Sequence, residues 1–365
     1  MIRKEKLQRI GKRIWRSIQM KLKNTQRIIP ALAVIPLLIG TLAGCSAQTE
    51  NRKLPVQVLI LPKFEVGEIS GDFPGEAQLF YEEYLAGGEV YEISGCPDTI
   101  RLYYKDGTAL CLAGQGKVAS AINTSAVLAD DRFDFSNAYI LSVGCGGSAE
   151  GYGIFGDVYV ISAAADFDLG HRADPREMSG PADTTWFYDK SFDSTAVIRL
   201  NADLTDRVFE QIRNIPLNTT EKTVWFLQKE YPDEAWAQRQ PQVLRGTSVT
   251  GDNFWKGRYD HQNALHITET YECSDPYAVA EMEDIAVAQA VRRFGLLDRL
   301  IILRVSVNMD VFPSGVTPEI LWGPVTDDHI ASEDSLESVD IFRTAMENCF
   351  AAGRVLIEAI RSGTL

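Results

Sequence analysis

The sequence has little histidine, no cysteine spacing typical of a metal site, and a single long apolar run. Only four of the 365 residues are His, and none of them stands at ligand spacing from a carboxylate or a Cys. The six Cys match no zinc motif, so we predict no structural metal. Buried thiols or one disulfide are both compatible with the sequence, which does not select a pair.

Positive charge is scarce beyond residue 27. Residues 1–27 contain ten Lys or Arg and one Glu, whereas the whole chain has a formal net charge of −14, so the remainder carries about −23. A nucleic-acid-binding surface needs Lys and Arg to replace the counterions of the phosphates. This charge balance argues against a nucleic-acid partner.

The one long uncharged run covers residues 28–44 and directly follows the basic segment. It is rather short for a membrane span, which takes roughly 20 residues. A basic region, an apolar core and a small-residue exit are typical of an export signal. The exit "LAGC" ending at Cys45 resembles a bacterial lipobox, in which a lipid-modified Cys45 becomes the first mature residue.

We therefore expect a signal peptide over residues 1–45, a tether over 46–55 and a folded domain over 56–365. The protein would lie outside the cytoplasmic membrane, attached by the lipid. An uncleaved signal anchor is the alternative. With one apolar run, the chain by itself would not form a pathway for solutes.

The folded part alternates short apolar runs with helical patterns, which predicts an α/β fold around a mixed, mostly buried sheet. Residues from about 171 to 245 are richer in polar and aromatic side chains, and we expect a less regular insert there. The expected strands are 56–61, 99–104, 109–113, 138–143, 157–162 and 299–307, and the expected helices are 77–85, 118–129, 204–212, 279–291 and 336–361.

Glycines cluster after two expected strands, where ligands of open α/β sheets bind. Gly114 and Gly116 precede the helix expected at 118–129, whose first amides could face an anion. Gly146 and Gly147 follow the next apolar run. The alternative in both places is tight packing against a neighbouring element.

Aromatic and polar side chains follow two further runs. Phe254 and Trp255 stand in a segment of Gly, Thr and Asp, where they could stack on a flat ring or anchor the segment in the core. The strand expected at the end of the domain carries Arg304, Asn308 and Asp310 toward one edge. Asn offers a donor beside an acceptor, which suits a purine edge.

An acidic residue, Glu283, stands within the pattern that predicts a helix over 279–291, with Asp275 as its cap and Pro276 at its first position. Helical spacing places Glu283 on the buried stripe. A buried carboxylate without partners is costly. We expect it either to accept hydrogen bonds from ligand hydroxyls or to form an internal ion pair with Arg304.

In this order, "GQGKVASA", "GCGGS", "TGDNFW", "EMEDIAVAQAV" and "LRVSVNMD" resemble the nucleoside phosphorylase and nucleosidase superfamily, and within it the purine nucleoside permease family. The resemblance covers most of residues 55–362. It implies a three-layer α/β/α sandwich with a central mixed sheet. It also implies cleavage of the N-glycosidic bond of nucleosides by phosphate or by water.

The resemblance assigns roles to individual residues. Met282 and Glu283 match the pair that holds the ribose, and Phe254 with Trp255 would lie against the base. Asn308 stands where nucleosidases have an Asp that protonates the base, so this position favours hydrogen bonding to N7 or O6. The glycines Gly114, Gly116, Gly146 and Gly147 would complete the substrate-binding set.

The same comparison leaves the nucleophile open between water and phosphate and favours water. Many phosphorylases hold phosphate with a Ser at the position of Ala119, whereas nucleosidases have Ala there. Arg304 and Glu76 match the Arg and Glu that position water in nucleosidases. We therefore expect Glu76, Arg304 and Asn308 to be catalytic, with no cofactor and with phosphate only as an alternative co-substrate.

The sequence thus predicts an exported lipoprotein that binds purine nucleosides and cleaves them, with hydrolysis favoured over phosphorolysis. The alternative is an uptake component that binds without cleavage and hands the nucleoside to a separate membrane transporter. Because relatives often complete their pockets across subunits, a homo-oligomer is also compatible with the resemblance.

Overall fold

The computed structural model describes residues 52–180, 184–231, 235–313, 315–317 and 336–365. The expected signal peptide, Cys45 and most of the tether lie outside these ranges. Within them, no helix combines the length and the apolar character that crossing a membrane requires.

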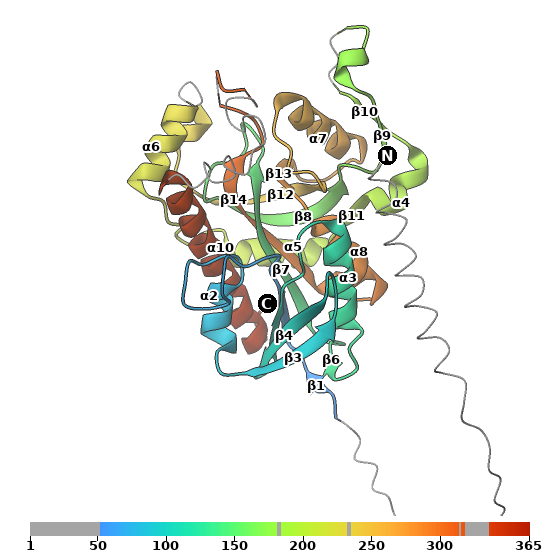
Figure 1. Cartoon of the computed structure of the whole chain (residues 1–365), viewed down its shortest axis with the longest axis vertical. Helices are drawn as coiled ribbons and strands as arrows, with labels where there is room; N and C mark the ends of the chain where they lie inside the picture. Colours follow the sequence, from blue (N-terminus) through green and yellow to red (C-terminus); the bar gives the residue numbers. More distant parts are fainter. Residues whose placement is uncertain (1–51, 181–183, 232–234, 314, 318–335) are drawn as a thin grey trace, which may run out of the picture. The chain divides into compact units, whose positions relative to one another are not determined.

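Ten strands of the described chain form one mixed sheet (Figure 1). The strand order is β11-β8-β12-β13-β7-β2-β5-β4-β3, and β14 pairs in parallel with β7 and antiparallel with β8. The bounds are β2 Val58–Leu61, β3 Glu89–Ser94, β4 Thr99–Lys105, β5 Thr108–Cys111, β7 Tyr139–Ser148, β8 Val158–Asp166, β11 Val197–Arg199, β12 Val243–Thr250, β13 Tyr277–Glu281 and β14 Leu300–Met309.

Helices cover both faces of this sheet. The helices α3 and α8 pack on one face, and α2, α5 and α10 pack on the other (Figure 1). The helix bounds are α2 Gln78–Phe80, continued by a π-helical turn at Tyr81–Leu85, α3 Lys117–Leu128, α4 Asp193–Ala196, α5 Ala202–Ile212, α6 Glu221–Glu230, α7 Arg258–Thr270, α8 Asp284–Arg293 and α10 Leu336–Ser362. Four short strands of the described chain lie outside the sheet: β1 Leu54–Pro55, β6 Phe133–Asp134, β9 His171–Arg172 and β10 Trp186–Phe187.

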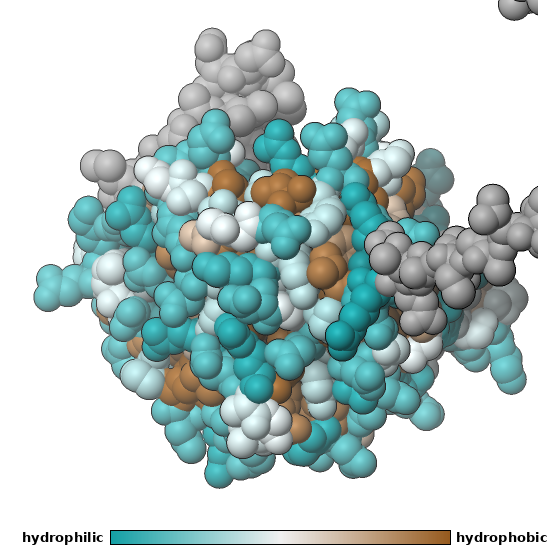
Figure 2. Space-filling view, turned by 90° about the horizontal axis from the view of Figure 1, so that it is seen from below, coloured by the Kyte–Doolittle hydropathy of each residue, from teal (hydrophilic) through white to brown (hydrophobic). Residues whose placement is uncertain are grey.

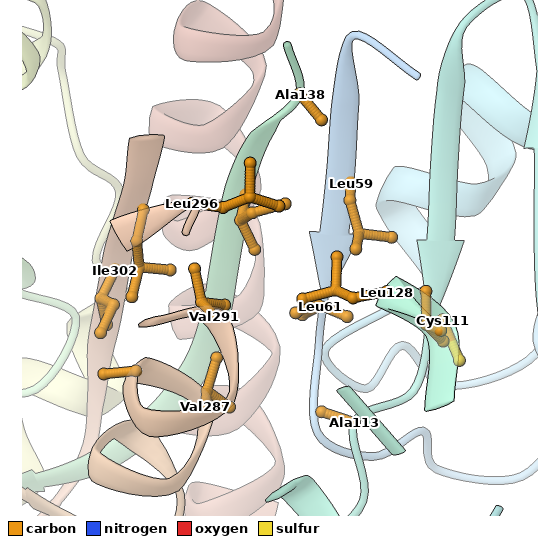
Figure 3. Close-up of a cluster of buried hydrophobic side chains, with 14 of the residues drawn as sticks. Leu59, Leu61, Cys111, Ala113, Leu128, Ala138, Val287, Val291, Leu296 and Ile302 are labelled. Atoms are coloured by element: carbon orange, nitrogen blue, oxygen red, sulfur yellow. The ribbon is translucent and has the colours of Figure 1, made fainter. Parts of the chain in front are cut away.

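The alternation of side chains along the central strands explains the three layers. In β14, Leu300 and Ile302 belong to the core under α3 and α8, whereas Ile301 and Leu303 belong to the core under α10. Figure 3 shows the first of these cores, with Ile302 beside side chains of α8. A strand that buries both faces reads as a continuous apolar run, so the expected α/β/α sandwich is confirmed.

One face of the molecule is mostly hydrophilic. In the face shown in Figure 2, hydrophilic residues dominate and apolar residues are scattered among them. The five cysteines of the described chain are free thiols, and Cys111 and Cys349 are buried.

The prediction of one helix over residues 279–291 is correct only from residue 284 onward. Residues 277–281 form β13, which lies between β12 and β7, and α8 begins only at Asp284. Pro276 therefore does not start a helix, and Asp275 pairs with Arg245 at 3.0 Å instead of capping one. A short buried strand and a buried helix cannot be separated by apolar periodicity alone.

Two stretches that lie outside the expected strands belong to central strands. Residues 246–250 are the second half of β12, and the glycine-rich stretch at 144–148 is the end of β7. Gly246 is required there because a Cβ would lie 2.1 Å from the Cβ of Ala278 on β13. The region 171–245 holds the hairpin β9–β10, the helices α4, α5 and α6, and the start of β12.

We expect Leu356→Ala to lower the free energy of unfolding by about 3 kcal/mol, because Leu356 of α10 is fully buried against the sheet. Urea denaturation measures the change. Glu347→Ala on the exposed side of the same helix is the matched control and should change stability by less than about 0.5 kcal/mol. Equal losses in the two variants would contradict the assigned packing face of α10.

Candidate functional site

Six of the residues singled out from the sequence line one small cleft at the ends of β7, β13 and β14. The cleft is small and partly open to solvent. Its residues singled out from the sequence are Gly147, Phe254, Trp255, Met282, Asn308 and Asp310, and Asn253, Ala280 and Glu281 complete the lining.

The two aromatic residues of the cleft have different surroundings. Trp255 stacks on Phe167, with ring centroids 4.9 Å apart and an interplanar angle of 16°. Phe254 is 59% exposed. Trp255 thus anchors the segment in the core, which is one of the two alternatives expected from the sequence. The ring of Phe254 is available to a flat ligand.

Behind the cleft, one arginine is buried among three carboxylates. Arg304 is 1% exposed, and its Nη2 lies 2.8 Å from Glu281, 3.1 Å from Glu283 and 2.6 Å from Asp284. Its Nη1 donates to the carbonyl of Cys145 at 2.9 Å. Of the two roles expected for Glu283, the structure thus contains the internal ion pair with Arg304.

Burial and the neighbouring charges in this cluster favour the protonated form of Glu281. Burial, followed by the neighbouring charge of Asp284, raises the pKa of Glu281 to about 7. Burial would lower the pKa of Arg304, but the three carboxylates hold that pKa well above its usual value. The guanidinium therefore stays charged, and Glu281 exchanges its proton near neutral pH.

Glu76 adjoins the same cluster at Gly144. Its Oε1 accepts from the amide of Cys145 at 2.8 Å and its Oε2 from the amide of Lys63 at 2.7 Å. A Cβ on Gly144 would lie 2.5 Å from Nη1 of Arg304 and 3.1 Å from Oε1 of Glu76. The structure therefore brings together the two residues expected to position water. Burial raises the pKa of Glu76.

The start of α3 is bonded to carboxylates of the protein itself. The amide of Gly116 donates to Oε1 of Glu283 at 3.0 Å, and the amide of Lys117 donates to Oδ1 of Asp252 at 2.8 Å. The ammonium of Lys117 in turn pairs with Asp166 at 2.9 Å and with Asp168 at 2.8 Å. Internal acids thus fill the anion position expected at this helix start.

The remaining predicted glycines serve packing. A Cβ on Gly146 would lie 2.5 Å from Cγ2 of Val279, and one on Gly114 would lie 3.0 Å from the Cβ of Ala119. Gly147 is different, because a Cβ there would lie 2.8 Å from Nδ2 of Asn308. Its missing side chain lets Asn308 lie along the wall of the cleft.

Sequence reasoning missed three acid or base partners of the site. Glu281 and Asp284 flank the predicted pair Met282 and Glu283, and the mistaken helix hid the strand end that turns them inward. His261 lies 49 residues from its partner Asp310 in sequence, so no local spacing shows the pair.

The family model of the purine nucleoside permease (NUP) matches residues 55–363. The chain belongs to this family. A probable purine nucleoside permease of Schizosaccharomyces pombe is 25% identical over 227 residues, which cover 56% of this chain and 65% of that protein. The purine nucleoside permease of Candida albicans is 28% identical over 210 residues, covering 52% of this chain and 51% of that protein. The NUP chain thus spans less than two thirds of the length of these relatives.

Solved structures agree with the NUP fold. The 5'-methylthioadenosine/S-adenosylhomocysteine nucleosidase of Neisseria meningitidis, in complex with methylthio-immucillin-A, matches with a TM-score of 0.50 at 15% identity. The match covers 83% of this chain and 99% of the nucleosidase. The corresponding nucleosidase of Helicobacter pylori gives a TM-score of 0.50 at 14% identity, with 84% and 99% covered. At these identities the likeness shows the fold, and the expected nucleosidase-like architecture is confirmed.

We expect the unfolding free energy of this NUP protein to fall by about 2 kcal/mol as the pH rises from about 5 to 8, through the pKa of Glu281 near 7. The folded state binds the Glu281 proton more tightly than the unfolded state, so this stabilisation is present at low pH and is lost as pH rises. Glu281→Gln, which imitates the protonated acid, should flatten the decline measured by denaturant titration at each pH. Parallel curves for the two proteins would contradict the assignment.

Proposed function

We propose that the protein binds purine nucleosides in this cleft and hydrolyses their N-glycosidic bond. It would do so outside the cytoplasmic membrane, held there by a lipid on Cys45. The observation that carries the proposal is the convergence of an exposed aromatic ring, Phe254, and an amide, Asn308, on a cleft backed by the cluster of Glu283, Arg304 and Glu76. The names and complexes of the relatives support a purine nucleoside as the ligand.

Three lining residues, and Glu283 in the cluster behind them, each suit one part of a nucleoside. The ring of Phe254 would stack on the purine, and the carboxamide of Asn308 would bond its N7 or O6 edge. Met282 would pack against the sugar. Glu283 would accept from the ribose hydroxyls, exchanging its contact with the Gly116 amide for a bond to the ligand.

The contacts of the cluster favour water over phosphate as nucleophile. Phosphate needs free amides at a helix start or a free guanidinium. Here the amides of Gly116 and Lys117 are bonded to Glu283 and Asp252, and Arg304 is bonded to three carboxylates. An anion would have to displace these acids, whereas a neutral water molecule would not.

Glu76 is the proposed general base. Burial raises the pKa of Glu76, which makes this carboxylate a stronger base than an exposed one. As the bond between C1' and N9 breaks, its electron pair leaves with the purine, and water adds its oxygen to the cationic sugar while Glu76 takes one of its protons. Asn308 stabilises the charge on the leaving base, which takes its proton from solvent.

Capture without turnover is the second candidate function. It is favoured by Asn308, which is not an acid, and by the complete engagement of Arg304 with carboxylates. The permease names of the relatives point the same way. In this case the lipoprotein would pass nucleoside to a separate membrane transporter, alone or as a homo-oligomer.

We expect the protein to release free purine base from inosine, adenosine or guanosine in the absence of phosphate. Chromatography of the products measures the release. Glu76→Gln should lower the rate at least about 100-fold, because it removes the base, while nucleoside affinity changes little. Release only with added phosphate would contradict hydrolysis, and binding without any release would establish capture.

Phe254→Ala should weaken nucleoside binding about tenfold, since it removes the stacking ring. Tyr259→Ala is the matched control: Tyr259 is 61% exposed, stands at the start of α7 and does not line the cleft. Calorimetric titration with inosine compares the two variants. Equal affinities in both would remove Phe254 from the binding site.

A further inference from the structure

A second cluster of titratable side chains adjoins the cleft and has no part in the proposed chemistry. Asp310 lines the cleft next to Asn308 and is fully buried. Its Oδ2 lies 2.7 Å from Nδ1 of His261 and 2.8 Å from the hydroxyl of Tyr277, and its Oδ1 accepts from the amide of Glu150 at 3.0 Å. Three elements besides β14 are therefore bonded to this one carboxylate.

The backbone of Asp310 holds the end of the segment that carries the aromatic residues. The amide of Gly257 donates to the carbonyl of Asp310 at 2.8 Å, and the amide of His261 donates to the carbonyl of Gly257 at 2.9 Å. Gly257 is thus fixed between β14 and the first turn of α7. Asp252, bonded to the amide of Lys117, fixes the other end of the segment.

We propose that His261 and Asp310 are positioning residues for the base-binding side of the cleft. While His261 carries its proton, the ion pair holds residues 252–257, and with them Phe254, in the nucleoside-binding position. When the proton is lost, nucleoside affinity falls. This inference rests on the proposed binding of nucleosides but is independent of their hydrolysis.

The groups around His261 set the direction of the effect. Burial lowers the pKa of His261, but the bond and the charge of Asp310 outweigh burial and raise it. Glu150 also raises this pKa, and Arg258, which pairs with Glu150 at 2.7 Å, lowers it. Burial raises the pKa of Tyr277 well above its usual value, so this hydroxyl remains a neutral donor.

When His261 loses its positive charge, the carboxylate of Asp310 keeps its hydrogen bond but loses its counter-charge. Neutral His261 can still donate from Nδ1, so the hydrogen bond persists. The buried carboxylate of Asp310, however, then lacks a positively charged partner, which is costly in an apolar setting. The stabilisation is complete at low pH and is lost as pH rises through the raised pKa of His261.

The test measures the dissociation constant of inosine by calorimetry between pH 5.5 and 9. We expect wild type to bind about fivefold more weakly at the upper end. His261→Asn keeps a donor near the position of Nδ1 but does not titrate, so its affinity should be independent of pH. His266→Asn, on the same helix, should keep the wild-type profile. A pH-independent wild type, or a His261→Asn variant with the wild-type profile, would overturn the proposal.

A second measurement separates this proposal from the proposed nucleoside binding. Hydrogen exchange of residues 252–257 in the ligand-free protein should accelerate as pH rises, beyond the intrinsic base-catalysed increase, in wild type but not in His261→Asn. If inosine does not bind at any pH but this difference is present, the nucleoside assignment fails and the coupling of His261 to the segment stands. If inosine binds and the exchange of the two proteins matches at every pH, the coupling is wrong.

Discussion

The buried guanidinium of Arg304 is the constraint on which the rest of the site depends. A cation with 1% exposure must be compensated by carboxylates and hydrogen-bond acceptors, or burial would cost several kcal/mol. The compensating acids come from the end of β13 and the start of α8, and a backbone carbonyl comes from β7. One side chain therefore fixes how three strand ends and a helix start meet.

This arrangement also shapes what the cleft could do. Glu281 lines the cleft and bonds Arg304 behind it, so ligand and cluster share a wall. Glu283 links Arg304 to the amide of Gly116 at the start of α3. A ligand that bonds Glu283 would therefore act on Arg304, which faces Glu76 across the space that a side chain on Gly144 would fill. In the proposed function, binding and chemistry would therefore be coupled through charge.

Much of the fold was readable from the sequence because apolar runs and turn residues reported it directly. The hairpin of β4 and β5 closes at Asp106 and Gly107, both with positive φ, as the "KDGT" stretch predicts. The strands β2 and β14 and the helices α3, α5 and α10 were likewise predicted near their observed positions. The segment of β13 was predicted as helix, because it is too short and too fully buried for its period to distinguish the two. The elements β3, β12 and α7 were not among those predicted.

The site was predicted less completely, for a physical reason. The family resemblance supplied Glu76, Arg304, Met282, Glu283 and Asn308 as matched positions, and the structure brings them to adjoining places. Partners that depend on tertiary packing gave no local signal. An Asp at the start of a helix is common, so the sequence around Asp284 does not indicate its bond to Arg304. The pairing of His261 with Asp310 exists only because α7 folds back on the end of β14.

The most direct test of this account is the affinity of purified protein for purine nucleosides when the sugar-facing acid is removed. Calorimetric titration of wild type with inosine should show saturable binding at one site per chain, and Glu283→Ala should weaken it at least about 100-fold, since a buried charge-assisted bond is lost. A folded Glu283→Ala protein with unchanged affinity would contradict the assignment of the cleft.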